Sequence, residues 1–120
     1  MQKKTLVVGA SSKPERYSNK AIRMLLENAY PVVAVGARND KVGPVAIEKG
    51  TPDFDDIHTV TMYLGPRNQM NMYDYILNLN PKRIIFNPGT ENAEFINMAK
   101  NNGIEVEQAC TLVLLSTDQF

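Results

Sequence analysis

Residues 5–8, Thr-Leu-Val-Val, are β-branched or apolar, and they open directly into a loop of small residues that begins at Gly9. Ser18, at the end of that loop, can cap a helix, because apolar residues recur behind it at three- and four-residue spacing. This order of strand, loop and helix leaves backbone N–H groups free at the helix start. Those groups and the helix dipole favour negative charge, so the corner suits a phosphate group. An ordinary strand-to-helix turn is the alternative interpretation.

A second strand follows the helix and completes a unit of strand, helix and strand. Residues 32–35, Val-Val-Ala-Val, come after Pro31 and show no alternation of polar and apolar side chains. Strands without alternation are buried on both faces, which is typical of parallel strands covered by helices. The intervening helix has an apolar face that can cover them, made of Ala21, Ile22, Leu25, Leu26 and Ala29.

The rest of the chain continues to alternate strands and helices. We expect further strands at residues 59–63, 83–86 and 104–107, with a short edge strand at 45–47. We expect a short helix at 51–56, a helix that Asn68 caps and Pro81 ends, and a helix from Thr90 to Gly103. The sequence therefore predicts one α/β domain over residues 1–120, with three layers doubly wound around a mainly parallel sheet.

Three loops that contain Gly or Pro follow expected strands, at residues 9–18, 64–68 and 87–90. In doubly wound folds, ligands bind at the carboxyl ends of the strands, where the strand order reverses. We therefore expect these loops to converge on one ligand site. Tyr17 and Tyr63 border the loops, and we interpret both as packing residues and not as ligand contacts.

The charge balance argues against binding to a polyanion. The 120 residues include 13 basic and 13 acidic ones, so no overall field attracts nucleic acid or an anionic membrane. The apolar run at residues 112–115 is far shorter than the ~20 residues that span a bilayer. The one cysteine, Cys110, has no partner for an internal disulfide, and the amino-terminal residues do not resemble a signal peptide. We therefore expect a cytoplasmic protein that binds neither nucleic acid nor membrane.

Side chains suited to catalysis or metal binding are sparse. His58 and Cys110 are the single residues of their types and lie far apart, so they predict neither a zinc cluster nor a nucleophile–base pair. We interpret Cys110 as a small buried hydrophobic residue and His58 as structural or exposed. The acids between residues 53 and 56 are explained by the dipole of the expected helix. The sequence thus predicts no catalytic residue and no metal site.

The loop sequences limit which nucleotide fits. The G-x-G-x-x-G pattern of dinucleotide sites is absent, because Gly9 is followed by Ala-Ser-Ser. No acid ends the second strand to accept a ribose 2′-hydroxyl, and the cations Arg38 and Lys41 follow that strand instead. They suit a phosphate on the ribose, as in NADP or coenzyme A (CoA), and charge alone does not choose between the two. A solvated basic loop is the alternative.

The same segments resemble a known family. Residues 8–18, Val-Gly-Ala-Ser-Ser-Lys-Pro-Glu-Arg-Tyr-Ser, resemble the opening of small bacterial CoA-binding proteins. Leu-Gly-Pro at 64–66 and Asn-Pro-Gly-Thr-Glu-Asn at 87–92 resemble the family's two later ligand-facing loops, and residues 110–113 resemble its C-terminal segment. The resemblance covers essentially the whole chain. It implies the Rossmann-like fold that also forms the CoA-binding part of the succinyl-CoA synthetase alpha subunit.

The resemblance also implies a place for each part of CoA. The phosphates would be held by the first loop, through Gly9, Ala10, Ser11, Pro14, Arg16 and Ser18. The adenine ribose and its phosphate would lie by the second strand, near Val35, Gly36, Arg38 and Lys41. The two later loops would line the path of the adenine or pantetheine with Leu64 and Pro66, and face the pantetheine arm with Asn87, Pro88 and Gly89.

We therefore predict a module that binds CoA or acyl-CoA without catalysis of its own. The alternatives are a small NADP-linked reductase, a CoA-dependent subunit that serves another enzyme chain, and an interaction domain with a vestigial pocket. The apolar residues near the C-terminus would allow pairing with a second copy of the chain or with such an enzyme.

Overall fold

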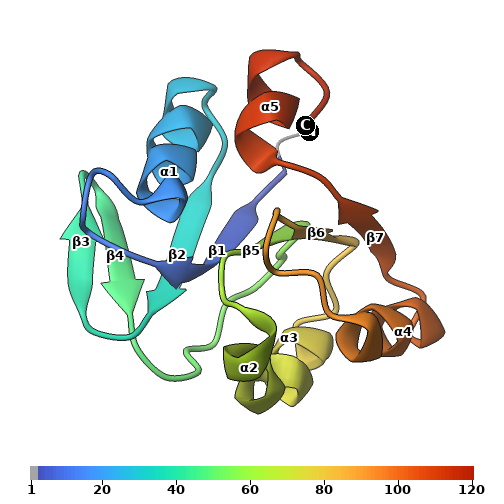
Figure 1. Cartoon of the computed structure of the whole chain (residues 1–120). Coiled ribbons are helices and arrows are strands. Elements are labelled where there is room, and N and C mark those ends of the chain that lie inside the picture. The colour runs from blue at the N-terminus through green and yellow to red at the C-terminus, as the bar shows by residue number, and fades with distance from the viewer. Residues whose placement is uncertain (1–2) are drawn as a thin grey trace.

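The computed structural model describes residues 3–120 and centres on one sheet. Its strands are β1 (Thr5–Ala10), β2 (Val32–Gly36), β3 (Asp40–Val42), β4 (Val45–Glu48), β5 (Thr59–Met62), β6 (Arg83–Phe86) and β7 (Glu105–Gln108). They lie in the order β3-β4-β2-β1-β5-β6-β7 (Figure 1). Every pairing is parallel except the β3–β4 hairpin at one edge. The chain builds the sheet outward from β1 in both directions, so the expected doubly wound, mainly parallel sheet is confirmed.

Helices cover both faces of the sheet. They are α1 (Tyr17–Glu27), α2 (Pro66–Gln69), the 3₁₀ turn η1 (Met70–Met72), α3 (Tyr73–Asn78), α4 (Ala93–Asn101) and α5 (Thr111–Ser116). Figure 1 shows α1 and α5 on one face and α2, α3 and α4 on the other. The fold is therefore the three-layer α/β arrangement that the sequence predicts.

The burial of β1 on both faces explains why its sequence does not alternate between polar and apolar residues. Leu6 and Val8 pack into one core, whereas Val7, between them, packs into the other. All three side chains are fully buried. A strand with a core on each face needs apolar residues at every position, so its sequence is an uninterrupted run of apolar residues.

Two expected helix caps are wrong. α1 begins at Tyr17 with Arg16 in the cap position, and Ser18 is a buried residue inside the first turn. α4 is capped by Asn92, whose side-chain oxygen accepts from the Phe95 N–H. Thr90 instead donates its hydroxyl to the Asn87 carbonyl. A Ser or Thr close to the start of a helix matches the sequence pattern of an N-cap. Whether its hydroxyl bonds to the first helical N–H groups or to another backbone group depends on the tertiary structure.

The segment at 51–56 is not helical, contrary to expectation. Its carbonyl groups are bound by side chains from elsewhere, since Tyr75 donates to the Pro52 oxygen and Lys4 to the Asp55 oxygen. Asp56 has a φ of 58°, which interrupts a right-handed helix. Tertiary hydrogen bonds therefore replace the local ones that a helix would have made.

Two further expectations differ in detail. Asn68 is not a cap, because α2 begins at Pro66 after Gly65, and residues 66–78 divide into α2, η1 and α3. The predicted edge strand at 45–47 is part of β4, which lies inside the sheet, and the edge is formed by β3. In residues 3–120, no helix is both long and apolar enough to cross a membrane.

Candidate ligand site

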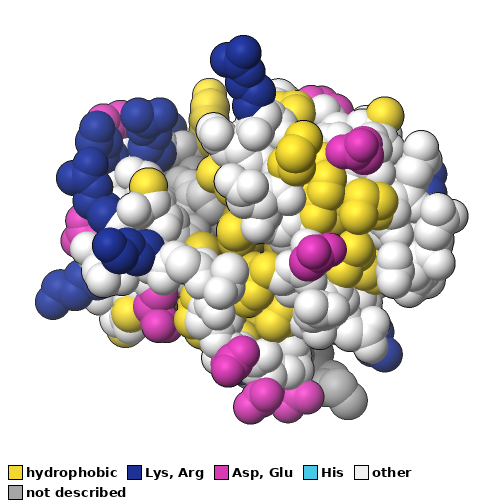
Figure 2. Space-filling view, turned by 90° about the horizontal axis from the view of Figure 1, so that it is seen from below, with side chains coloured by type: hydrophobic (Ala, Val, Ile, Leu, Met, Phe, Trp, Pro, Cys, Tyr) yellow, Lys and Arg dark blue, Asp and Glu magenta, His cyan; other side chains and the backbone are white. Residues whose placement is uncertain are grey.

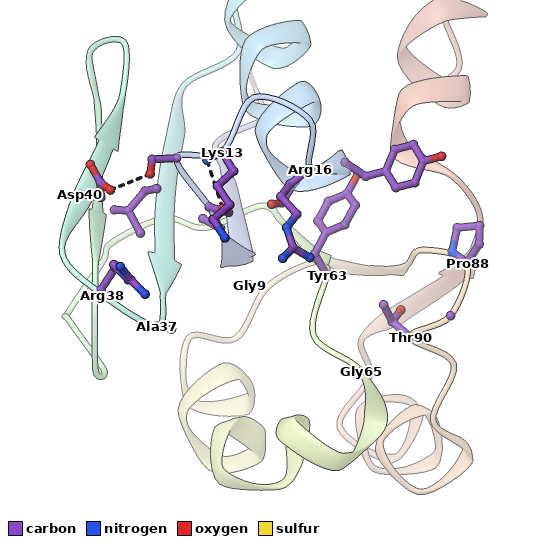
Figure 3. Close-up of a pocket in the computed structure, with 17 residues that line it drawn as sticks. Gly9, Lys13, Arg16, Ala37, Arg38, Asp40, Tyr63, Gly65, Pro88 and Thr90 are labelled. Carbon is purple, nitrogen blue, oxygen red and sulfur yellow. Dashed lines mark hydrogen bonds between the residues drawn. The ribbon is translucent and has the colours of Figure 1, made fainter.

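A cavity of about 510 Å³ opens where the carboxyl ends of β1, β2, β5 and β6 meet. Part of its wall is formed by the last two residues of β1, the loop after it and the first turn of α1, at positions 9–13 and 16–18. The rest is formed by residues 37, 38 and 40 beyond β2, 63 and 65 after β5, 88–90 after β6, and Ile47 of β4. We call this cavity the central pocket (Figure 3). It lies where the strand order reverses, and its volume is within the ~300–1,000 Å³ of small-molecule sites.

Two glycines allow the loops of the central pocket to pack closely. Gly9 has a φ of 91°, and a Cβ at this position would lie 2.9 Å from the carbonyl carbon of Tyr63. A Cβ on Gly36 would collide with the carbonyl oxygen of Ala10. Both positions therefore require glycine because backbone from the neighbouring strand passes in front of them.

The loop between β1 and α1 is held rigidly by α1. The Asn19 side chain donates to the Ser11 carbonyl over 3.0 Å, and Arg23 donates to the Pro14 carbonyl over 3.1 Å. Arg23 also donates to Asn19, so the two anchors are themselves joined. The loop is thus preorganised by one buried side chain, Asn19, and one exposed side chain, Arg23, of the helix that follows it.

The N-terminus of α1 faces the central pocket without a capping side chain. Arg16, in the cap position, makes no side-chain cap bond, and the first turn contains no acid. Arg16, Tyr17 and Ser18 all line the pocket. The free N–H groups of an 11-residue helix and its dipole therefore meet the cavity where an anionic ligand could satisfy them.

The electrostatic character of the central pocket is net positive. Lys13, Arg16 and Arg38 line it, whereas Asp40 is the single carboxylate in its wall. Across residues 3–120 the only ion pair joins Arg83 to Glu107, so the three pocket cations have no carboxylate partner. Figure 3 shows Lys13 and Arg16 on the segment after β1 and Arg38 on the segment after β2, and Figure 2 shows Lys and Arg gathered at one end of the face seen from below.

Asp40 is held in place by two hydrogen bonds. One carboxylate oxygen accepts from the Ser12 hydroxyl at 2.6 Å, and the other accepts from the Lys41 N–H at 2.9 Å. These two bonds, with the Ser12 bond as the larger cause, lower the pKa of Asp40 below its ordinary value. The first loop and the β3–β4 hairpin are thereby joined across the mouth of the pocket.

The loop after β6 is positioned by Asn87, which is 2% exposed. Its amide donates to the Thr61 hydroxyl and the Met62 carbonyl, and its oxygen accepts from the Thr111 N–H, all at 2.8 Å. The side chain is therefore committed to β5 and α5. Asn87 supports Pro88 and Gly89, which do line the central pocket.

The residues expected at the site divide into two sets. Those that line the central pocket are Gly9, Ala10, Ser11, Arg16, Ser18, Arg38, Pro88 and Gly89. Those that lie outside its wall are Pro14, Val35, Gly36, Lys41, Leu64, Pro66 and Asn87. Lys41 is exposed on β3, where its backbone pairs with Ala46, so of the two cations expected near the ribose phosphate only Arg38 lines the pocket wall.

The sequence analysis missed several residues of the pocket wall. They are Ser12, Lys13, Tyr17, Ala37, Asp40, Ile47, Tyr63, Gly65 and Thr90. Lys13 and Ser12 could have been found, since they belong to the small-residue loop itself. No pattern in the sequence indicated Asp40 or Ile47 as pocket residues, because they reach the pocket through the pairing of β3 with β4.

The two tyrosines of the wall differ from each other. Tyr17 is 67% exposed, so the expectation that it is a packing residue is wrong. Tyr63 is half-buried, and its enclosed hydroxyl has no hydrogen-bond partner among residues 3–120. The nearby Thr111 hydroxyl bonds to the Thr61 hydroxyl instead. Burial, only partly offset by the nearby Thr111 hydroxyl, raises the pKa of Tyr63 to about 12. Tyr63 therefore presents a neutral ring to the cavity.

The remaining chemistry-bearing side chains lie elsewhere. His58 precedes β5 and so lies at the opposite end of the sheet, where its ring nitrogen is 2.8 Å from the Thr59 hydroxyl. Burial, and to a smaller extent the positive charge of Arg83, lowers the pKa of His58. Cys110 is half-buried at the start of α5, which is more exposed than expected. Neither residue lines the central pocket.

Solved structures with this fold cover nearly all of the chain. A protein described as uncharacterized is 42% identical, with 100% of this chain and 99% of that chain covered and a TM-score of 0.97. A hypothetical protein from Pyrococcus horikoshii OT3 is 26% identical, with coverages of 94% and 82% and a TM-score of 0.82. A protein from Thermus thermophilus is 24% identical, with coverages of 99% and 91% and a TM-score of 0.86, which shows the fold alone.

The family comparison agrees with the resemblance in the loop sequences. Among curated proteins, none is significantly similar to this chain. The family model described as "CoA binding domain" matches residues 3–116, which include all four segments around the central pocket. The chain therefore belongs to the CoA-binding domain family.

Proposed function

We propose that this chain binds CoA or an acyl-CoA in the central pocket and has no catalytic activity of its own. The observation that carries this proposal is the uncapped N-terminus of α1, which opens into a cavity with three unpaired cations within residues 3–120. An anion at that position would satisfy N–H groups that no side chain within residues 3–120 caps. Membership of the CoA-binding domain family supports the identity of the ligand.

The diphosphate would lie against the loop at residues 9–18. Gly9 and Ala10 keep the backbone accessible there, and Arg16 and Lys13 supply charge. Arginine and lysine in the wall stabilise phosphate oxygens through charge-assisted hydrogen bonds. Ser12 is already a donor to Asp40, so Ser11 and Ser18 are the hydroxyl groups assigned to this part of the ligand.

The two ends of CoA would leave the diphosphate in opposite directions. The adenosine end would lie toward Arg38 and Ile47, and the pantetheine arm toward Pro88 and Gly89. Four of the expected contacts would act mainly by holding the loops after β2, β5 and β6 in place; they are Val35, Gly36, Leu64 and Asn87. We propose Lys41, Pro14 and Pro66 as outer contacts at the rim.

Calorimetric titration with CoA, dephospho-CoA, NADP and NAD tests the proposal. We expect CoA to bind, and to bind more tightly than dephospho-CoA, because Arg38, which has no carboxylate partner within residues 3–120, would pair with the ribose phosphate that dephospho-CoA lacks. Binding of NADP without CoA would overturn the proposal in favour of a nicotinamide-linked reductase. Mass spectrometry of ligand that copurifies with the protein would identify any acyl group.

The absence of catalysis is proposed from the composition of the pocket wall. The wall contains neither His nor Cys, and its one carboxylate, Asp40, is bound by Ser12 and Lys41. This composition suits a binding module, which would deliver its ligand to a partner enzyme or to a second copy of the chain. The single thiol of Cys110 fits a reducing compartment, and we propose the cytoplasm.

A further inference from the structure

Arg38 and Asp40 form a pair of opposite charges in the wall of the central pocket. Both belong to the short connection that leaves β2 and enters β3. They make no ion pair with each other, since Arg83–Glu107 is the only one within residues 3–120. Figure 3 shows the two side chains on the same side of the cavity, with the Asp40 carboxylate turned toward Ser12 and the Arg38 guanidinium separate from it. Each group is therefore free to contact a ligand.

The Asp40 carboxylate keeps the capacity to accept further hydrogen bonds. A carboxylate offers about four acceptor positions, and Ser12 and the Lys41 N–H occupy two of them. These two bonds also fix its orientation at the pocket wall. Asp40 can thus accept from a ligand hydroxyl, and it would repel a ligand phosphate at the same place.

An acid after the second strand has a known use in nucleotide-binding folds. Where it ends that strand, it accepts a hydrogen bond from a ribose hydroxyl. β2 ends at Gly36 without such an acid, but the turn into the β3–β4 hairpin brings Asp40 to the pocket wall. Ser12 holds it there, so the hairpin supplies a carboxylate that the strand end lacks.

We infer that Arg38 and Asp40 together select adenosine that carries a phosphate on the 3′-oxygen and a free hydroxyl on the 2′-carbon. This inference rests on the proposed function, because CoA has that arrangement. Arg38 contacts the 3′-phosphate and Asp40 accepts from the 2′-hydroxyl. The isomer with a 2′-phosphate, as in NADP, puts its phosphate against the Asp40 carboxylate and is rejected. Asp40 therefore determines the specificity for the 3′-phosphate isomer, which the positive charge of Arg38 alone could not do.

Two isomeric probes test this assignment on the intact chain. Adenosine 3′,5′-bisphosphate and adenosine 2′,5′-bisphosphate have the same composition and charge, so calorimetry with both isolates the position of the phosphate. We expect the 3′ isomer to bind more tightly by about tenfold or more. In Asp40→Asn we expect the two dissociation constants to agree within about twofold, because asparagine keeps the size of the side chain without its charge.

A matched control removes the same charge elsewhere. Asp118 is exposed beyond α5 and does not line the pocket, so Asp118→Asn should keep the full preference for the 3′ isomer. Equal affinity of the unsubstituted chain for both isomers would overturn the inference. A preference that survives in Asp40→Asn would also overturn it. If CoA itself fails to bind, the proposed function is wrong, whereas CoA binding without isomer preference refutes the role of Asp40 alone.

Discussion

The buried side-chain amide of Gln69 donates a hydrogen bond of 2.8 Å to the backbone carbonyl of Thr90. The same nitrogen donates to the Leu64 carbonyl at 2.9 Å, and the amide oxygen accepts from Asn92 at 3.0 Å. One fully buried residue of α2 therefore joins the loop after β5 to the loop after β6. These loops form two sides of the central pocket, so Gln69 sets their separation without lining the cavity.

Gln69→Ala should lower the free energy of unfolding by about 2–4 kcal/mol, because it takes the donor from the buried Thr90 carbonyl and the half-buried Leu64 carbonyl and opens a cavity. Urea denaturation measures this change. Asn68→Ala is the matched control, since Asn68 precedes Gln69 in α2 and is exposed, and its effect should stay within about 0.5 kcal/mol. Similar values for the two variants would show that the link between the loops is unimportant.

Gly9→Ala should destabilise the fold more than Gly89→Ala does. Both glycines have a φ near 90°, but a Cβ on Gly9 would lie 2.9 Å from Tyr63 backbone, whereas a Cβ on Gly89 meets no atom within 4 Å. Backbone strain alone should cost Gly89→Ala about 1–2 kcal/mol, and the close approach should add to that cost at Gly9. Thermal or urea unfolding compares the two variants, and equal costs would contradict the close packing of the two loops.

Arg16→Ala should weaken CoA binding by about 1–3 kcal/mol, the range for losing a hydrogen bond to a charged group, and should leave the unfolding transition in place. Arg16 lines the central pocket at the start of α1, and within residues 3–120 it has no carboxylate partner whose loss would destabilise the fold. Lys82→Ala removes the same charge at an exposed position before β6, at the other end of the sheet, and should leave CoA affinity unchanged. Calorimetry on both variants provides the measurement. Unchanged affinity in Arg16→Ala would remove Arg16 from the site.

Tyr63→Phe should preserve or raise the stability of the fold, by up to about 2 kcal/mol, because it deletes a buried hydroxyl that has no hydrogen-bond partner in the described part of the chain. Burial also holds the folded-state pKa of Tyr63 at about 12, above the ordinary value of 10.0. Between these two pH values the unfolded chain loses the proton first, so Tyr63 lowers stability as the pH rises from 10 to 12. Tyr63→Phe should therefore lose less stability in that range.

Tyr75→Phe is the opposite case and serves as the comparison. Burial also raises the pKa of Tyr75 to about 12, but its hydroxyl donates to the Pro52 carbonyl at 2.6 Å. Losing that bond should cost about 0.5–1.5 kcal/mol at neutral pH. Urea unfolding at pH 7 and at higher pH distinguishes the two variants, and a destabilised Tyr63→Phe would mean that its hydroxyl does have a partner.

The central parallel strands and their burial on both faces follow directly from the amino-acid sequence, whereas the edge strand β3 does not. β1 and β2 are recognisable because a strand buried on both faces needs apolar residues at every position, as Leu6, Val7 and Val8 show. The loop that begins at Gly9 is recognisable because its small residues lie between such a strand and an amphipathic helix. These signals are local, since each depends on residues within one element and its neighbouring turn.

Tertiary structure alone decided the details of the caps and of the pocket wall. Asn92 and Thr90 both fit a helix cap in sequence, and the bond from Thr90 to the Asn87 carbonyl leaves the cap to Asn92. Asp40 reaches the central pocket because β3 pairs with β4 and Ser12 donates to its carboxylate. These contacts join residues far apart in the chain, so no local pattern encodes them, and they become visible only when the sheet has brought the strand ends together.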